Sequence, residues 1–192
     1  SMRLQNFFGF RQNFFDVNFF HNILRQVTTH RKQRGLENDF IQKLIINDQG
    51  RLIVFGDLQG AFHSLVRNLT YITSLDILSS SMQLNEDAYI IINGNLINSA
   101  PYNLETLLIV LVLMQQNSER VIYIQGTIEH EIESDSSELY HGLKIQAGDK
   151  ADEIFKDIKE FFNTLPKALY VTRGKKDVLK ISSMPLKKFR DN

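Results

Sequence analysis

The sequence has no cysteine, no apolar run long enough to cross a bilayer, and no excess of either charge. Without cysteine it forms no disulfide and no thiolate metal site, which fits a reducing compartment. The longest apolar run, Leu107 to Met114, suits a buried helix and is too short for a membrane span. The start of the chain also shows no signal-peptide pattern, so we expect a cytoplasmic protein without a membrane span.

The charges balance overall, 22 basic against 22 acidic residues, but they are unevenly placed. Residues 1–36 hold six basic side chains and one acidic one, residues 166–192 hold eight and two, and the middle carries a net charge of −11. Such an arrangement could stabilise packing between flanks and centre, or steer a partner. The basic flanks lack a groove-reading motif with interleaved aromatic residues, so we predict no nucleic-acid binding.

At 192 residues and 43% hydrophobic content, the chain is long enough for one globular domain. Apolar residues spaced by three and four predict helices over residues 13–30, 36–46, 61–78, 103–116 and 149–165. Residues 169–171 and 178–181 resemble two strands joined by a hairpin-like connection. Together these segments predict an α/β chain with a largely parallel sheet.

Half of the 14 phenylalanines fall in the first twenty residues. Most of these rings are expected in the core, because those from Phe15 onward follow the helical spacing. Phe7, Phe8 and Phe10 precede it, and they could cover an open part of the core or meet another chain. We therefore expect self-association, if it occurs, through this Phe-rich segment or through an exposed sheet edge.

Three segments share one pattern, a short β-branched strand followed by a glycine and a polar loop. They are residues 51–60 with Gly56, residues 89–101 with Gly94, and residues 121–131 with Gly126. Sites in α/β sheets lie just beyond the carboxyl ends of strands, so these three loops should share one rim.

The three loops resemble, in order, the GDxHG, GDxVDRG and GNHE motifs of the calcineurin-like metallophosphoesterases, within them the protein serine/threonine phosphatases. Here they read Gly56-Asp57-Leu58-Gln59-Gly60, Gly94-Asn95-Leu96-Ile97-Asn98-Ser99-Ala100 and Gly126-Thr127-Ile128-Glu129. The resemblance runs from about Arg51 to the last residues and implies a metallophosphoesterase core of a parallel sheet flanked by helices. It divides the chain into an N-terminal helical segment, 1–50, packed on a phosphatase-like core, 51–192. We expect a single domain that is a fragment of a longer protein, with the family's second sheet beyond Asn192.

The resemblance also implies two metal ions, ~3.5–4 Å apart, that activate water and polarise a phosphate. Most of the positions that would bind these ions or the phosphate hold a different residue type from the one that the resemblance implies. They are Gln59 for a histidine, Asn95 for the bridging aspartate, Asn98 and Ser99 for an Asp-Arg pair, Gln125 for an arginine, Thr127 and Ile128 for an Asn-His pair, and Ser182 for a later histidine. Asp57 and Glu129 survive, and one carboxylate at the metal position does not hold a dinuclear centre.

The surviving polar residues also have structural interpretations. Asp57 lies between a strand and a helix, where a carboxylate accepts backbone N–H bonds as a turn or cap residue, and Glu129 can tie down its loop. His130, between two glutamates, is a candidate ligand, although such a charged run is more typical of a solvated loop. His63 and His141 have no partner at ligand spacing.

Three functions remain open. The first is a catalytically inactive pseudophosphatase that binds a protein partner or acts as a scaffold, with no catalytic residue, no metal and no cofactor. The alternative is a divergent phosphoesterase that retains Mn, Fe or Zn through Asp57, Asn95 and His130 or Glu131. The third is a module that shields phosphorylated partners, for which the arginines expected at positions 99 and 125 are absent.

Overall fold

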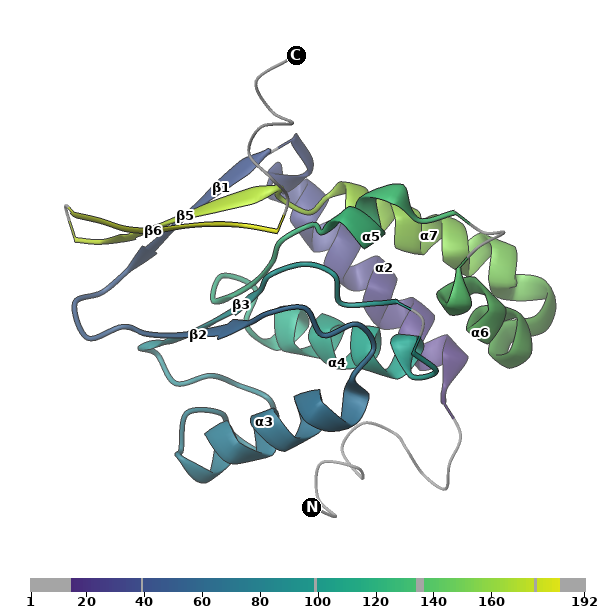
Figure 1. Ribbon diagram of the computed structural model, residues 1–192, viewed down its shortest axis with the longest axis horizontal. Helices are drawn as coiled ribbons and strands as arrows, with labels where there is room; N and C mark the ends of the chain where they lie inside the picture. Colours follow the sequence, from purple (N-terminus) through teal and green to yellow (C-terminus); the bar gives the residue numbers. More distant parts are fainter. Residues whose placement is uncertain (1–14, 39, 99, 134–136, 175, 184–192) are drawn as a thin grey trace.

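The computed structural model describes residues 15–183 except 39, 99, 134–136 and 175. Its elements follow the chain in an α/β order (Figure 1). They are α2 Val17–Gln33, η2 Leu36–Asn38, β1 Ile41–Ile46, β2 Arg51–Phe55, α3 Phe62–Ser74, β3 Ala88–Ile92, α4 Asn103–Gln116, β4 Val121–Tyr123, α5 Thr127–Glu131, α6 Glu138–Ala147, η3 Gly148–Lys150, α7 Ala151–Asn163, β5 Ala168–Arg173 and β6 Lys176–Ser182.

The strands form two three-stranded sheets. The β2-β3-β4 sheet is parallel throughout, with Ile53 opposite Ile90 and Ile91 opposite Ile122. In the β1-β5-β6 sheet, β1 runs parallel to β5 and β5 antiparallel to β6. Leu44 and Leu169 of this second sheet share one buried apolar cluster with the two isoleucines Ile91 and Ile122 of the first. The two sheets therefore pack face to face.

Helices cover the other side of the β2-β3-β4 sheet. Helix α4 is apolar on all sides and buried along almost its whole length, as expected for a helix enclosed by other elements. Helix α2 packs against both α4 and α7, and Figure 1 shows α2, α4 and α7 running side by side. Among the described residues, no helix combines the length and the apolar character that a membrane span requires.

Most predicted helices are present with shifted ends. Helix α2 begins after Asp16, whose side chain accepts a hydrogen bond from the Phe19 N–H at 2.9 Å and so caps the first turn. Helix α7 buries Ile154, Ile158 and Phe161 on one face, as the spacing predicted. Phe7, Phe8 and Phe10 lie outside the described residues.

One expectation was wrong. The predicted helix over residues 36–46 is instead the short η2 turn followed by strand β1. Side chains in β1 alternate, Leu44 and Ile46 being buried while Ile45 is exposed, which is the period of a strand. Because β1 pairs with β5, it adds a parallel strand to the β5-β6 hairpin and completes a second three-stranded sheet. The expected family sheet beyond Asn192 stays a prediction.

Candidate functional site

The loops after β2, β3 and β4 meet at one rim, as the parallel sheet requires. The backbones of two glycines in these loops, Gly94 and Gly126, lie almost in contact. A Cβ on Gly126 would lie 2.3 Å from the Asn95 nitrogen, and a Cβ on Gly94 would lie 2.7 Å from the Gly126 Cα. Gly94 also has a φ of +72°, which favours glycine. These glycines are needed because no side chain fits between the loops.

Backbone hydrogen bonds continue past the ends of the strands and hold the rim together. The Gln59 N–H donates to the Asn95 carbonyl at 2.9 Å, and the Gly60 N–H donates to the Leu96 carbonyl at 2.7 Å. Gln59 and Asn95 both have positive φ values, 48° and 46°. Such values are uncommon outside glycine, so the rim holds both residues in a conformation that the sequence alone would not favour.

Glu129 lies at the centre of this arrangement and is 2% exposed. Its Oε2 accepts from the backbone N–H groups of Asn95 at 2.9 Å and Gly126 at 2.8 Å. Its Oε1 accepts from the Leu96 N–H at 2.7 Å and from the Tyr123 hydroxyl at 2.8 Å. One carboxylate thus satisfies four donors, three of them buried and one part-buried, and fixes the second and third loops to each other.

Tyr123 is fully buried beneath this carboxylate. Burial, and then the neighbouring negative charge of Glu129, raise the pKa of its phenol well above the ordinary value. Tyr123 therefore stays protonated and acts as a hydrogen-bond donor to the rim.

Asn95, at the position of the family's bridging aspartate, makes two hydrogen bonds with its side-chain amide. Its Oδ1 accepts from the Ile128 N–H at 3.2 Å, and its Nδ2 donates to Asp57 Oδ2 at 3.2 Å. These partners fix the orientation of the amide, because a backbone N–H can only donate and a carboxylate accepts. The N–H₂ group therefore points toward Asp57.

The remaining rim positions carry little ligand capacity. Asn98 Nδ2 lies 3.4 Å from Gln59 Oε1, so two further amides face each other. Thr127 and Ile128 offer a hydroxyl and an aliphatic chain where the resemblance implies an amide and an imidazole. One carboxylate and neutral amides, one of which turns its N–H₂ group toward that carboxylate, do not fit a pair of divalent cations.

The structure brings Ser183, and not Ser182, to the rim. The Ser182 hydroxyl donates to the Lys167 carbonyl at 3.2 Å. The Ser183 hydroxyl donates to the Gln125 carbonyl at 2.6 Å and lies beside Gly94. Ile181 is buried in the sheet interface, so the two-residue period of a strand places residue 183 on the same side, a signal that the sequence contained.

Gln125, where the resemblance implies an arginine, is buried and points away from the rim. Its amide donates to the Phe162 carbonyl at 2.9 Å, at the end of α7. Gln125 therefore joins the sheet to a helix and offers no phosphate-binding group.

The histidines are spread over different places. His63 packs against the rings of Phe62 and Tyr102, at centroid distances of 5.3 and 5.1 Å, and these two rings also contact each other. His130 lines a cavity with Phe40 and Lys167, which is separate from the cavity that Glu131 lines. His141 lies beside the ring of Tyr140 in α6. Among the described residues, none of these histidines joins Asp57 in a group of three ligand-type side chains.

One group of three ligand-type side chains does cluster within the described part of the chain, His21, Glu153 and Asp157. Arg25 donates to Asp157 at 2.8 Å and to Glu153 at 2.7 Å, and His21 lies 2.7 Å from Asp157. Burial acts against the ionised form of Asp157, but hydrogen bonds from His21 and Arg25 outweigh it and lower its pKa. The group is an ion-pair network that joins α2 to α7.

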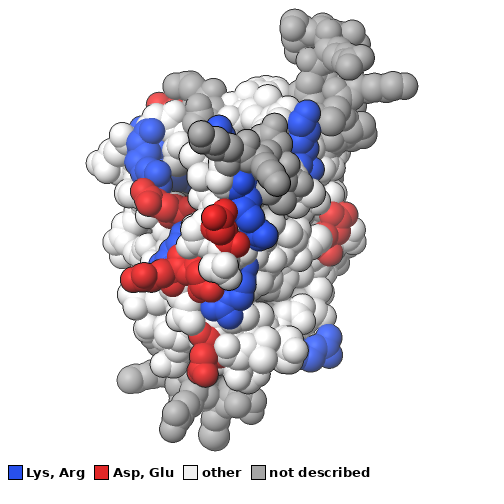
Figure 2. All heavy atoms as spheres, turned by 90° about the vertical axis from the view of Figure 1, so that its left-hand side faces the viewer, with Lys and Arg blue, Asp and Glu red and all other residues white. Residues whose placement is uncertain are grey.

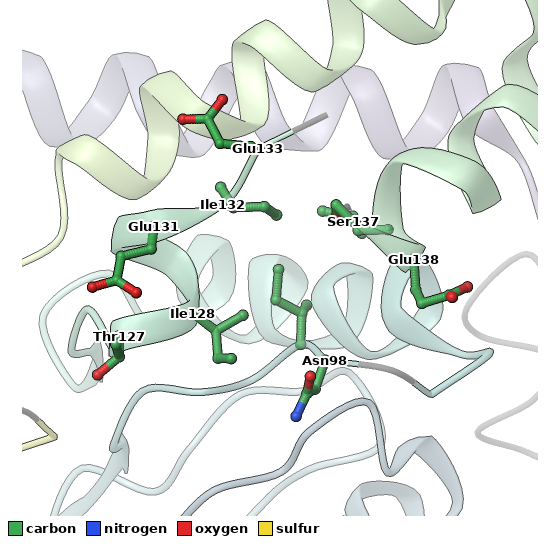
Figure 3. A pocket seen from close by; sticks show the side chains of 10 residues that line it. Asn98, Thr127, Ile128, Glu131, Ile132, Glu133, Ser137 and Glu138 are labelled. Carbon is green, nitrogen blue, oxygen red and sulfur yellow. The ribbon is translucent and has the colours of Figure 1, made fainter. Parts of the chain in front are cut away.

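A cavity of about 260 Å³ opens beside the rim, between α5 and α6 (Figure 3). Asn98, Thr127 and Ile128 line its side nearest the rim. Glu131 and Glu138 also line it and lie on opposite sides in Figure 3. No lysine or arginine is among its described lining residues.

Comparison with known proteins gives related results from sequence and from structure. The chain is 29% identical over 128 residues to an Arabidopsis thaliana protein named serine/threonine-protein phosphatase 7 long form homolog. The match covers 65% of this chain but 9% of that protein, so the chain spans a small part of its relative. No family model matches the sequence.

Among solved structures, a protein serine/threonine phosphatase from Saccharomyces cerevisiae superposes with a TM-score of 0.68 at 15% identity. That superposition covers 82% of this chain and 46% of the yeast chain. A cold-active protein-tyrosine phosphatase from a Shewanella species superposes with a TM-score of 0.52 at 14% identity, over 72% of this chain and 44% of its own. At 15% and 14% sequence identity, these superpositions show a similar fold and nothing about function.

Proposed function

We propose that this chain, which shares the fold of a protein serine/threonine phosphatase, does not hydrolyse phosphoesters and acts by binding a protein partner. The proposal rests on the site and not on the fold, because one fold supports many functions.

The observation that carries the proposal is the hydrogen bonding of Asn95. Its amide oxygen is engaged by the Ile128 N–H, and its amide nitrogen faces the Asp57 carboxylate. In a dinuclear phosphatase this position bears a carboxylate whose charge offsets two dications. Here a neutral group donates to Asp57, the one carboxylate that the first motif retains, instead of adding a second charge beside it.

The buried carboxylate of Glu129 adds to this argument. Its four partners are all protein donors, so its lone pairs are taken up by the loops. The positions where the resemblance implies phosphate-gripping arginines are Ser99 and Gln125, and neither side chain carries charge. A bound phosphoester would therefore meet neither metal ions nor these two cations.

Elemental analysis combined with an activity assay tests the proposal. Protein purified without chelator at neutral pH is expected to contain well under one equivalent of manganese, iron or zinc per chain. Addition of manganese should produce no hydrolysis of p-nitrophenyl phosphate above that of an Asp57→Ala variant, which serves as the matched control.

The opposite result would identify a divergent phosphoesterase. Two equivalents of metal per chain, or manganese-dependent hydrolysis that Asp57→Ala abolishes, would overturn the proposal. Such activity would mean that Asp57 and side chains outside the rim motifs assemble a metal site.

A further inference from the structure

We infer that the outward face of the β1-β5-β6 sheet docks an amphipathic helix of a partner protein, one that carries acidic side chains beside a row of leucines. This inference deepens the proposed function and rests on it, since it names the chemistry of the partner. The inward face of this sheet packs on the β2-β3-β4 sheet. Figure 1 shows the labelled helices below the β1-β5-β6 sheet and to its right, so no helix of the described part of the chain covers the outward face.

The alternation of side chains along the strands decides which of them lie on this face. Leu44 and Leu169 belong to the apolar cluster between the two sheets. The two-residue period of a strand therefore places their neighbours Lys43 and Tyr170 on the outward face. The register pairs Lys43 with Tyr170, and Tyr170 with Lys180 of β6. These three side chains thus form one row across the sheet.

Apolar side chains flank this row and are exposed to solvent. Ile41 and Ile45 lie in β1 on either side of Lys43, with exposed fractions of 51% and 64%. The residues opposite them in β5 are Ala168 and Thr172, two small side chains that leave the isoleucines uncovered. Exposed apolar side chains that share one face, as these do, are typical of an interaction site.

The charge on this part of the molecule is positive. Lys43 and Lys180 are exposed and have no carboxylate partner among the described residues. In sequence, residues 41–46 and 168–182 hold five basic residues and one acidic residue, although the whole chain is neutral. Figure 2 views the molecule from the side to which the β5-β6 hairpin points, and there basic and acidic side chains are mixed. The described outward positions carry lysine alone, which complements an acidic partner.

The spacing of these side chains fits a helix that lies along the strands. Ile41 and Ile45 are four residues apart in β1, which corresponds to about 13 Å. Leucines seven or eight residues apart on one side of a helix are separated by about 10–12 Å. Lys43 and Lys180 are two strand spacings apart, about 10 Å, which is close to the diameter of a helix. A helix over β5 would therefore hold acidic residues on both flanks, one near each lysine.

A lipid surface suits this face less well than a helix does. Binding at a membrane interface buries apolar groups about 5–10 Å into the boundary between headgroups and acyl chains. The two isoleucines instead belong to a strand and lie level with the side chains beside them. A helix that covers a sheet face is also the usual second layer of an α/β domain.

A peptide titration monitored by amide NMR of the isotope-labelled protein tests the inference. The probe is a capped helical peptide of about 18 residues with leucines along one side and glutamates on both flanks. We expect it to shift the amide signals of Lys43, Ile45 and Tyr170. A second peptide, with glutamine in place of each glutamate, should bind about tenfold more weakly. A third, with the composition of the first but no apolar side, should leave these signals unchanged.

A double variant, Lys43→Gln with Lys180→Gln, should lower the affinity for the glutamate peptide by about tenfold. The matched control is Lys150→Gln with Lys156→Gln, which changes two exposed lysines of η3 and α7 and should leave the affinity unchanged. The dispersion of the amide spectrum shows whether each variant remains folded.

A second variant tests the apolar part of the face. Ile45→Thr keeps a β-branched residue in the strand but removes apolar surface, and should also weaken peptide binding by about tenfold. Its control is Ile145→Thr, because this isoleucine of α6 is likewise exposed but lies on a helix. The control should bind the peptide as the original protein does.

Equal binding of the glutamate and glutamine peptides, or equal losses in a variant and its control, would overturn the inference. So would binding to phosphatidylserine vesicles that the double lysine variant abolishes, if the peptide produces no shifts, because the face would then bind lipid. The titration is run in chelator, so it is independent of the metal test. Metal-free, inactive protein that does not bind the glutamate peptide would refute the docking face alone. Peptide binding by a protein that also holds two metal ions and hydrolyses phosphoesters would refute the proposed lack of activity alone.

Discussion

Replacing Glu129 by glutamine should cost the domain a large part of its stability, although the change is nearly isosteric. Each carboxylate oxygen of Glu129 accepts from two donors. A glutamine amide has one oxygen and one N–H₂ group, so whichever way it turns, the N–H₂ group faces two buried donors. Each unsatisfied buried donor costs about 1–3 kcal/mol, so we expect a loss of about 3–5 kcal/mol. Domains of this kind are stable by about 5–15 kcal/mol, so the loss is a large fraction of the total.

Urea unfolding followed by circular dichroism measures the loss as a change in midpoint at unchanged slope. Glu131→Gln is the matched control, because this exposed neighbour should change the stability by at most about 0.5 kcal/mol. A loss below about 1 kcal/mol for Glu129→Gln would refute the view that Glu129 holds the loops together.

A double-mutant cycle with Tyr123→Phe examines the same network from the donor side. Phenylalanine removes the hydroxyl that donates to Glu129 Oε1, and leaves only the Leu96 N–H on that oxygen. A glutamine at position 129 can then turn its N–H₂ group toward a single donor. Glu129→Gln should therefore cost about 1–2 kcal/mol less in the Tyr123→Phe background than in the original protein.

Two further changes test the packing of the rim and the contact between helices. Gly126→Ala should destabilise the domain by several kcal/mol in urea unfolding, because the added Cβ would lie 2.3 Å from the Asn95 nitrogen. The control Gly56→Ala should cost about 1 kcal/mol or less, because no atom lies within 4 Å of its Cβ. Equal losses of stability in the two variants would contradict the close approach of the loops. Asp157 has a lowered pKa in the folded protein, so its ionised form contributes stability above the unfolded pKa, and this contribution disappears as the pH falls through the lowered value. Asp157→Asn should thus be less stable than the original at pH 7, and the difference should shrink as the pH falls through the lowered pKa of Asp157. A difference that persists after Asp157 is protonated would show that Asp157 acts by packing alone.

The sequence predicted the part of the fold that depends on local pattern. The β-branched runs before Gly56, Gly94 and Gly126 became β2, β3 and β4, and the apolar run from Leu107 to Met114 became the buried α4. The first three runs are short, rich in β-branched residues and end on a glycine, which favours strands, whereas the apolar run in α4 lies within a longer segment, Asn103–Gln116, of helical length. The hairpin of β5 and β6 was also predicted, because two short strand-like runs flank a glycine-containing turn.

Strand β1 could not be predicted in this way. The run from Leu36 to Ile46 has apolar residues at positions that suit either a helix or a strand, and short apolar runs are ambiguous in this respect. Pairing with β5, in which Leu44 lies opposite Val171, decides that this segment forms a strand and not a helix. That partner is distant in the chain, and nothing local reveals it.

The candidate site, like the fold, was only partly predictable from the sequence. The motif positions identified Asn95 and Glu129 as rim residues, but not the direction in which their side chains donate and accept. Glu129 draws its four donors from two loops and the end of β4, and Asn95 connects a helix N–H to a carboxylate on another loop. These bonds depend on the close approach of Gly94 to Gly126, which is a property of the assembled sheet.

Hydrogen bonding at the rim would let a phosphatase-like fold persist without metal ions, as the proposed function requires. In a metal-dependent rim, cations offset converging carboxylates, and their removal leaves like charges in contact. Here Asn95 places an amide N–H₂ group against Asp57, and the charge of Glu129 is met by four protein donors. The loops are therefore held by neutral donors and one buried acceptor.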